Sequence, residues 1–186
     1  MKMDRHTHHT ALARLLGFYF LASVAGGEIV DRIAVVVDRT AIKQSDVMRD
    51  LRITAFINGE RPDFGLAEQK KAANRLIDQA MIRKEIGMGR YPDPEPALVN
   101  LLFQQIRQMY RSEAAFRQAL TTYGITEDEL MEHLRWQEAV LQFIAVRFRS
   151  GGTSEGAQND PNQPFFNWLD ETRKQSRVLF KEESLK

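Results

Sequence analysis

The sequence predicts a mainly α-helical fold in which a small β-sheet joins the beginning and the end of the chain. Two observations carry this prediction. Apolar residues three and four positions apart recur through most of residues 45–148, which is the spacing of helices that bury one face. Before residue 150, only Ile29–Val37 shows β-branched alternation after the N-terminal segment, and a second short apolar run, Arg177–Lys181, lies close to the C-terminus.

Length and composition are those of a globular protein with a core of its own: 186 residues, 43% hydrophobic and 27% charged. Net charge is +1; three of the 26 basic and one of the 25 acidic residues lie in residues 1–27, so the remainder carries −1. Nucleic-acid binding needs clustered Lys and Arg side chains, so we expect no nucleic-acid partner. Cysteine is absent, which excludes a small scaffold built on disulfides.

Residues 1–27 have the pattern of a signal peptide for export. A basic start precedes the uncharged run 15–25, and Ser23 and Ala25 place small residues at the −3 and −1 positions of a cleavage site. The run is shorter than the about 20 apolar residues of a membrane-crossing helix. We therefore expect a periplasmic protein with no membrane anchor after cleavage, and an uncleaved N-terminal anchor is the alternative.

The first strand leads into a turn and a helix. Asp38–Thr40 is typical of a turn, and Ala41–Lys43 predicts a short return strand. Ser45 and Asp46 then offer N-cap chemistry for a helix from near Val47 to about Ile57, where Asn58-Gly59 ends it. A lone hairpin is marginally stable in water, so this sheet needs a further strand.

Four more helices follow before residue 150. The predicted ranges are 66–88, 97–110, 113–122 and 127 to about 148. Asp93 and Pro94 are the start signals of the helix 97–110. Its expected buried face is the apolar stripe Leu98, Leu101, Leu102, Ile106, Met109 and Tyr110. Thr126 and Glu129 have the spacing of a capping box, which fixes the start of the helix from 127 to about 148.

Residues 150–164 are rich in Gly, Ser, Asn and Pro, which predicts a flexible linker. An amphipathic helix, 165–174, and the strand 177–181 come next. Their apolar anchors, Phe165, Trp168 and Leu169, predict that the tail docks on the helical body, because burial must offset the entropy of ordering. The tail strand then pairs with Ile29–Val37, so 28–149 and 165–186 form one domain.

These segments, in this order, resemble the N-terminal domain of the SurA-like periplasmic chaperones and related parvulin-type foldases. The resemblance rests on VDRIAVVVDRTAIKQSDV (30–47), RLIDQAMIRKEIGMG (75–89), the helix from Thr122 to Gln137, and the tail 165–180. It implies a SurA-N-like helical body closed by the C-terminal helix and strand. It also implies a holdase, which binds unfolded or extended segments of exported and outer-membrane proteins without a cofactor.

One part of the family pattern is missing. In the family, one or two parvulin domains of about a hundred residues stand where this chain has only the linker 150–164. A prolyl-isomerase activity therefore has no residues to rest on, and we expect no enzyme. His133 is the only histidine after the signal segment, and we interpret it as a surface or half-buried helix residue rather than a general base.

Adaptable apolar side chains are the candidate peptide-binding residues, because flexible thioethers and aromatic rings suit surfaces that accept many sequences. The candidates are Met81, Met88, Phe103, Met109, Tyr110 and Phe116. Core packing is the alternative for each of them. At the level of function, a dedicated interaction or assembly protein of the cell envelope with one partner is the alternative to a holdase.

Overall fold

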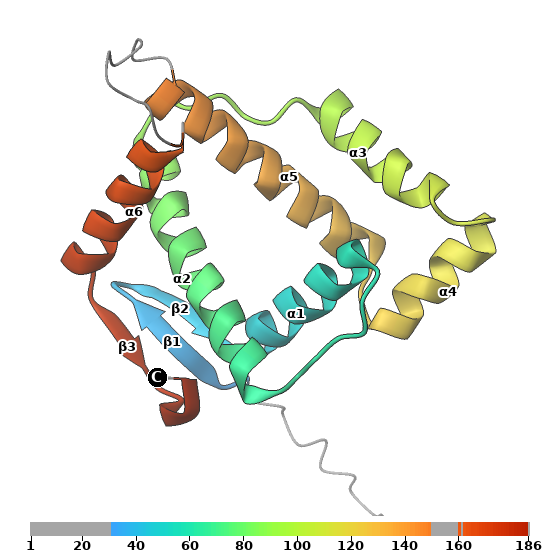
Figure 1. The fold of residues 1–186 in the computed structure, drawn as a ribbon, viewed down its shortest axis with the longest axis horizontal. Coiled ribbons are helices and arrows are strands. Elements are labelled where there is room, and N and C mark those ends of the chain that lie inside the picture. The colour runs from blue at the N-terminus through green and yellow to red at the C-terminus, as the bar shows by residue number, and fades with distance from the viewer. Residues whose placement is uncertain (1–30, 150–159, 161, 186) are drawn as a thin grey trace, which may run out of the picture. The chain divides into compact units, whose positions relative to one another are not determined.

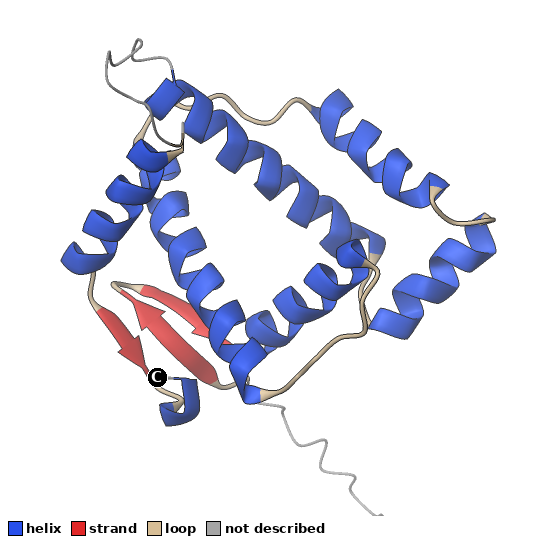
Figure 2. Ribbon diagram, in the orientation of Figure 1, coloured by secondary structure: helices blue, strands red, loops and turns tan. Residues whose placement is uncertain are grey.

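The computed structural model describes residues 31–149, 160 and 162–185, and in these the protein is mainly helical with one small antiparallel sheet (Figures 1 and 2). The predicted fold class is confirmed. The predicted signal peptide, 1–27, and most of the linker, 150–164, lie outside the described residues. Gln163 and Pro164, which the prediction assigned to the linker, belong to the first turn of a helix.

The sheet joins strands from both ends of the described chain. β1 (Ile33–Val37) is central, with β2 (Thr40–Lys43) on one side and β3 (Val178–Phe180) on the other. Val36 lies opposite both Ala41 and Leu179. The predicted pairing of the tail strand with the first strand is therefore confirmed (Figure 1).

Asp38 holds the sheet together at the turn. Its φ of 52° is the left-handed conformation that Asp tolerates better than most residues. Its carboxylate accepts hydrogen bonds from the Arg177 backbone N–H at 2.9 Å and from Lys84 Nζ at 2.8 Å. One side chain thus links the hairpin to the tail strand and to the helical body.

The alternation expected for the first strand fails at its start, at Ile33 and Ala34. Val35 and Val37 are buried as expected, but Ile33 is exposed and Ala34 is buried. The register shifts between Ile33 and Val35, and such a bulge reverses which side chains face the core.

The first two helices agree closely with the sequence prediction. α1 (Gln44–Asn58) begins three residues earlier than expected and ends at Gly59, whose φ is 68°. The Asp46 carboxylate accepts the Lys43 backbone N–H at 2.8 Å, so Asp46 caps the helix from its third position. α2 (Leu66–Met88) has the predicted bounds.

The next three helices are α3 (Pro96–Gln108), α4 (Glu113–Tyr123) and α5 (Glu127–Ile144). α5 continues as one π-helical turn, η1 (Ala145–Arg149). The Thr126 capping box is confirmed, since Thr126 and Glu129 exchange hydrogen bonds. The predicted start of α3 at Pro94 is wrong, because Pro96 occupies its first position.

The predicted buried face of α3 is also partly wrong. Val99 and Phe103 are its buried residues, while Leu98, Leu101 and Met109 are exposed. Phe103 packs edge-on against Phe116, with ring centroids 5.7 Å apart, and this aromatic contact sets which stripe faces inward. Leu141 of α5 is exposed as well.

The tail docks on the body as predicted. α6 (Gln163–Gln175) buries Phe165 and half-buries Trp168 and Leu169 against an aromatic cluster around Phe143. Arg173 of α6 donates hydrogen bonds to Asp78 Oδ1 and Asn74 Oδ1 of α2. A final 3-10 turn, η2 (Glu183–Leu185), carries a buried leucine.

Three groups of buried residues form the core of this single compact unit. The sheet core lies between the strands, α1 and α2, and contains Ala34, Val35, Val37, Ile42, Val47, Leu51, Ala72, Ala73, Ile77, Met81 and Leu185. The aromatic core joins α1, α3, α4 and α5, and contains Ile53, Phe56, Val99, Phe103, Phe116, Leu120, Ile125, Leu130 and Leu134. The tail core centres on Ile82, Phe143 and Phe165.

Candidate functional site

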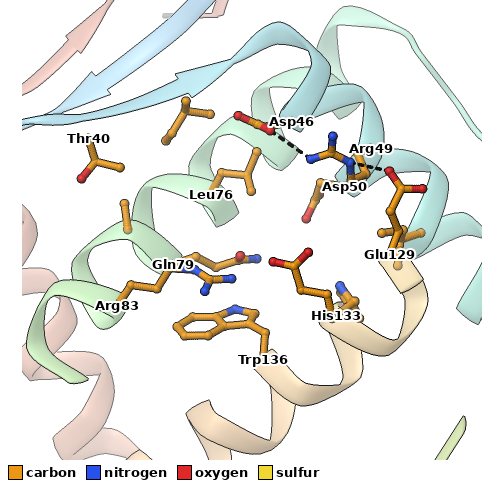
Figure 3. A pocket seen from close by; sticks show the side chains of 14 residues that line it. Thr40, Asp46, Arg49, Asp50, Leu76, Gln79, Arg83, Glu129, His133 and Trp136 are labelled. Carbon is orange, nitrogen blue, oxygen red and sulfur yellow. Dashed lines mark hydrogen bonds and ion pairs between the residues drawn. The ribbon is translucent and has the colours of Figure 1, made fainter. Parts of the chain in front are cut away.

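A pocket of about 250 Å³ lies where β2, α1, α2 and α5 meet (Figure 3). Its walls come from three parts of the chain: β2 with α1, which follows it directly, then α2, and α5. Its lining residues are Thr40, Ile42, Asp46, Arg49, Asp50, Ile53, Leu76, Gln79, Ala80, Arg83, Glu129, Glu132, His133 and Trp136.

Apolar side chains and one indole ring form part of the pocket. Ile42 and Ile53 are buried, and Trp136 is half-buried. The Arg83 guanidinium lies over the Trp136 ring, 3.9 Å from its centroid, which is the geometry of a cation–π contact (Figure 3). Burial lowers the pKa of Arg83, and the charge of Glu132 opposes that effect. The guanidinium stays charged at neutral pH because its ordinary pKa is so high.

The opposite wall is charged. Arg49 Nε donates to Glu129 at 2.8 Å and Arg49 Nη1 donates to Asp46 at 3.1 Å (Figure 3). Burial alone would raise the pKa of Glu129, but hydrogen bonds from the Thr126 backbone and from Arg49 outweigh it, and the pKa is lowered. Glu129 is therefore ionised at neutral pH and fixes α5 to α1.

Asp50 and His133 occupy the deeper part of the charged wall. Asp50 is 7% exposed and accepts a hydrogen bond from Arg75 Nε at 3.1 Å. Burial lowers the pKa of His133; Asp50 raises it in part and Arg75 lowers it further. The imidazole is thus neutral at pH 7. This placement agrees with the interpretation of His133 as a half-buried helix residue.

The lining combines one hydroxyl group with four carboxylates, two guanidiniums and one imidazole. Thr40 supplies the one hydroxyl among the lining residues, and no hydrogen bond joins it to His133 in the described chain. In that same part of the chain, no three His, Cys, Asp or Glu side chains come together in a way that could hold a metal ion. The volume is also smaller than the about 300–1,000 Å³ typical of small-molecule sites and suits a single side chain.

The six predicted peptide-binding residues do not form one surface. Met81 lies in the sheet core, Phe103 and Phe116 lie in the aromatic core, and Tyr110 packs beside them. These four make packing contacts, so the prediction of a shared binding groove needs correction. The reason is the aromatic cluster itself: Tyr110 and Phe116 have ring centroids 5.5 Å apart, and Phe56 lies between the helices with them.

Met88 and Met109 are the two candidates that reach the surface, each 69% exposed. Met109 shares the exposed side of α3 with Leu98 and Leu101. This side has no charged residue between Pro96 and Ile106, which is unusual for a solvated helix face.

The pocket residues were missed because no local pattern marks them. Ile42 has the pattern of an ordinary strand residue, Arg83 that of a solvated helix residue, and Trp136 that of a core residue of α5. Only the packing of α2 against β2 and α5 brings them together. The one weak signal of the pocket in the sequence is RWQE at 135–138, where a Trp stands among polar residues of a helix.

No family model matches this chain, and no curated protein gives a significant match to it. In the described residues, no helix is both long enough and apolar enough to cross a membrane. The fold and the pocket define the class of the protein: a mainly α domain with a small antiparallel sheet that joins the two ends of the described chain, and a mixed apolar and charged pocket beside it.

Proposed function

We propose that this protein is a periplasmic chaperone of the holdase type, which binds unfolded or extended segments of exported proteins, including outer-membrane proteins, without catalysis. The observation that carries the proposal is the pocket between β2, α1, α2 and α5, with an indole ring and apolar side chains beside charged groups. Export rests on the signal-peptide pattern of residues 1–27.

The pocket supports binding of a polypeptide segment through its mixed chemistry. Apolar lining residues and Trp136 suit a large apolar side chain, whose burial is worth about 1.5–3 kcal/mol. Asp46 and Glu129 are paired with Arg49, and Asp50 is paired with Arg75, so these charges tolerate contact with a polar backbone at little cost. Such a site binds weakly and selects little, as a holdase requires.

Exposed apolar residues of α3 add a second surface of the same character. Leu98 and Leu101 lie on a stretch of helix without charged residues, and Met109 follows Arg107 as the C-cap residue; all three are exposed. A contiguous exposed apolar patch on a soluble protein often marks a binding surface. These residues support a client surface wider than the pocket alone.

The test is suppression of aggregation. A denatured outer-membrane β-barrel protein is diluted into buffer with residues 28–186 of this protein, and light scattering follows aggregation. We expect suppression at equimolar to several-fold molar excess. Trp136→Leu should weaken suppression, whereas the exposed Leu179→Ser on β3 should leave it unchanged. Unchanged scattering at several-fold excess of the wild type would count heavily against a holdase.

A second measurement separates the holdase from a dedicated assembly protein. Capture from a periplasmic extract should return a spread of unfolded clients for a holdase. A single stoichiometric partner would favour the interaction protein instead. A peptide isomerisation assay should give the background rate, since residues 150–164 are too few for a parvulin domain between the helical body and the tail.

A further inference from the structure

The outer edge of β2 offers backbone groups for pairing with another strand. Asp38 N–H donates to the Arg177 carbonyl, so the backbone groups of Asp38 and, two residues earlier, Val36 face β3. By alternation, Val35 and Val37 bond to β2, through Ile42 and Thr40. The N–H and C=O of Ala41 therefore point away from β1, and no other part of the described chain hydrogen-bonds to them.

This edge adjoins the pocket. Thr40 and Ile42 both line the pocket, and they flank Ala41 in the strand. Ala41 itself is exposed, as are Thr40 and Lys43. A residue paired with Ala41 would carry its own side chain on the face of Ala41, while the residues on either side of it would face the pocket.

The charges around the pocket restrict the incoming segment. Four carboxylates line it: those of Asp46, Asp50, Glu129 and Glu132. Arg49 and Arg83 line it too, and Arg75 pairs with Asp50 from outside, so three guanidiniums face four carboxylates. With His133 neutral, one negative charge remains in excess, which favours a basic residue in the segment and disfavours an acidic one.

We propose that the outer edge of β2 binds an extended polypeptide segment by strand addition. One large apolar side chain of the segment enters the pocket beside Trp136, and a neighbouring Lys or Arg faces the excess carboxylate charge. Backbone hydrogen bonds to Ala41 supply affinity that does not depend on the sequence, and the pocket supplies the preference for an apolar side chain. This inference rests on the proposed holdase function and gives it a site and a binding mode.

A peptide titration tests the site directly. The probe is a Thr- and Val-rich heptapeptide with one central Phe and a Lys at each end. The chain contains two tryptophans, so Trp168→Phe leaves Trp136 as the single tryptophan, and its emission on selective excitation reports on the pocket. We expect saturable change of Trp136 emission, and at least several-fold weaker binding when both Lys residues of the peptide are replaced by Glu.

The matched variants are Ala41→Pro and Ala41→Ser in the Trp168→Phe background. Proline removes the outward N–H and blocks the edge, but leaves the ladder to β1 intact, because the N–H of residue 41 does not bond to β1. Serine keeps the N–H. We expect about tenfold weaker peptide binding for Ala41→Pro and less than about threefold change for Ala41→Ser.

Each outcome of these measurements supports or overturns strand addition at β2. Equal affinity of the Pro and Ser variants overturns strand addition. Binding seen by calorimetry without a change in Trp136 emission overturns the pocket as the site. If Ala41→Pro does not fold, single N-methylation along the peptide replaces it, and affinity insensitive to every N-methyl group overturns the proposal. Failure here with intact suppression of aggregation refutes only the binding mode; loss of suppression by the wild type refutes the proposed function.

Discussion

Leu185 allows a sharp test of how much the docked tail stabilises the domain. It is 1% exposed and packs in the sheet core with residues of β1, α1 and α2. Burying a leucine side chain is worth about 1.5–3 kcal/mol, and truncation to alanine leaves a cavity that adds to the loss. Since η2 is one short turn that can relax into the space, we expect Leu185→Ala to cost about 2–3 kcal/mol.

The measurement is thermal and denaturant unfolding followed by circular dichroism. For a domain of this size, about 2–3 kcal/mol lowers Tm by roughly 4–12 °C. Leu179→Ala is the matched control, because Leu179 lies in the same tail but is 36% exposed, and it should change stability by less than about 1 kcal/mol. Equal losses for the two variants would refute the reasoning that η2 completes the core.

Three further predictions concern buried charge and pH. Arg75→Met should cost about 2 kcal/mol in denaturant unfolding, below the about 3–5 kcal/mol of a fully buried pair, because it strands the carboxylate of Asp50 while Arg75 itself is 41% exposed. His133 has a lowered pKa, so its contribution is fully present above about pH 6.5 and is lost as pH falls below that value; His133→Gln should flatten this part of the stability–pH curve. Asp38 has a pKa lowered by its hydrogen bonds from Lys84 and the tail backbone, so its contribution is lost as pH falls below about 3.8, and Asp38→Asn should remove that acid-side loss.

Local signals in the sequence were enough to predict most elements and the pairing of the tail. The bounds of α2 follow from a long periodic face, and the start of α5 follows from Thr126 and Glu129. The return of the tail could be inferred because Trp168 and Phe165 are too apolar to remain in solvent, and the first hairpin lacked a partner. These predictions succeeded because each depends on a strong pattern that fits one arrangement of the chain.

The buried face of α3 and the pocket could not be predicted in the same way. Two overlapping stripes run along α3 and share Leu102, Ile106 and Tyr110. The contact of Phe103 with Phe116 selects the stripe with Val99 over the one with Leu98, and that choice depends on α4. The pocket depends on four elements at once, so its residues carry no shared local signature.

The pairing of β1 with β3 also fixes when the domain can finish folding. The hydrogen bond from the Arg177 N–H to Asp38 joins residues 139 positions apart. During synthesis, β1 and β2 exist first as an isolated hairpin, which is marginal in water. The strand β3 and Leu185, which complete the sheet core, arrive last. Such distant contacts slow folding, so the sheet core stays incomplete until residues 178–185 have been made.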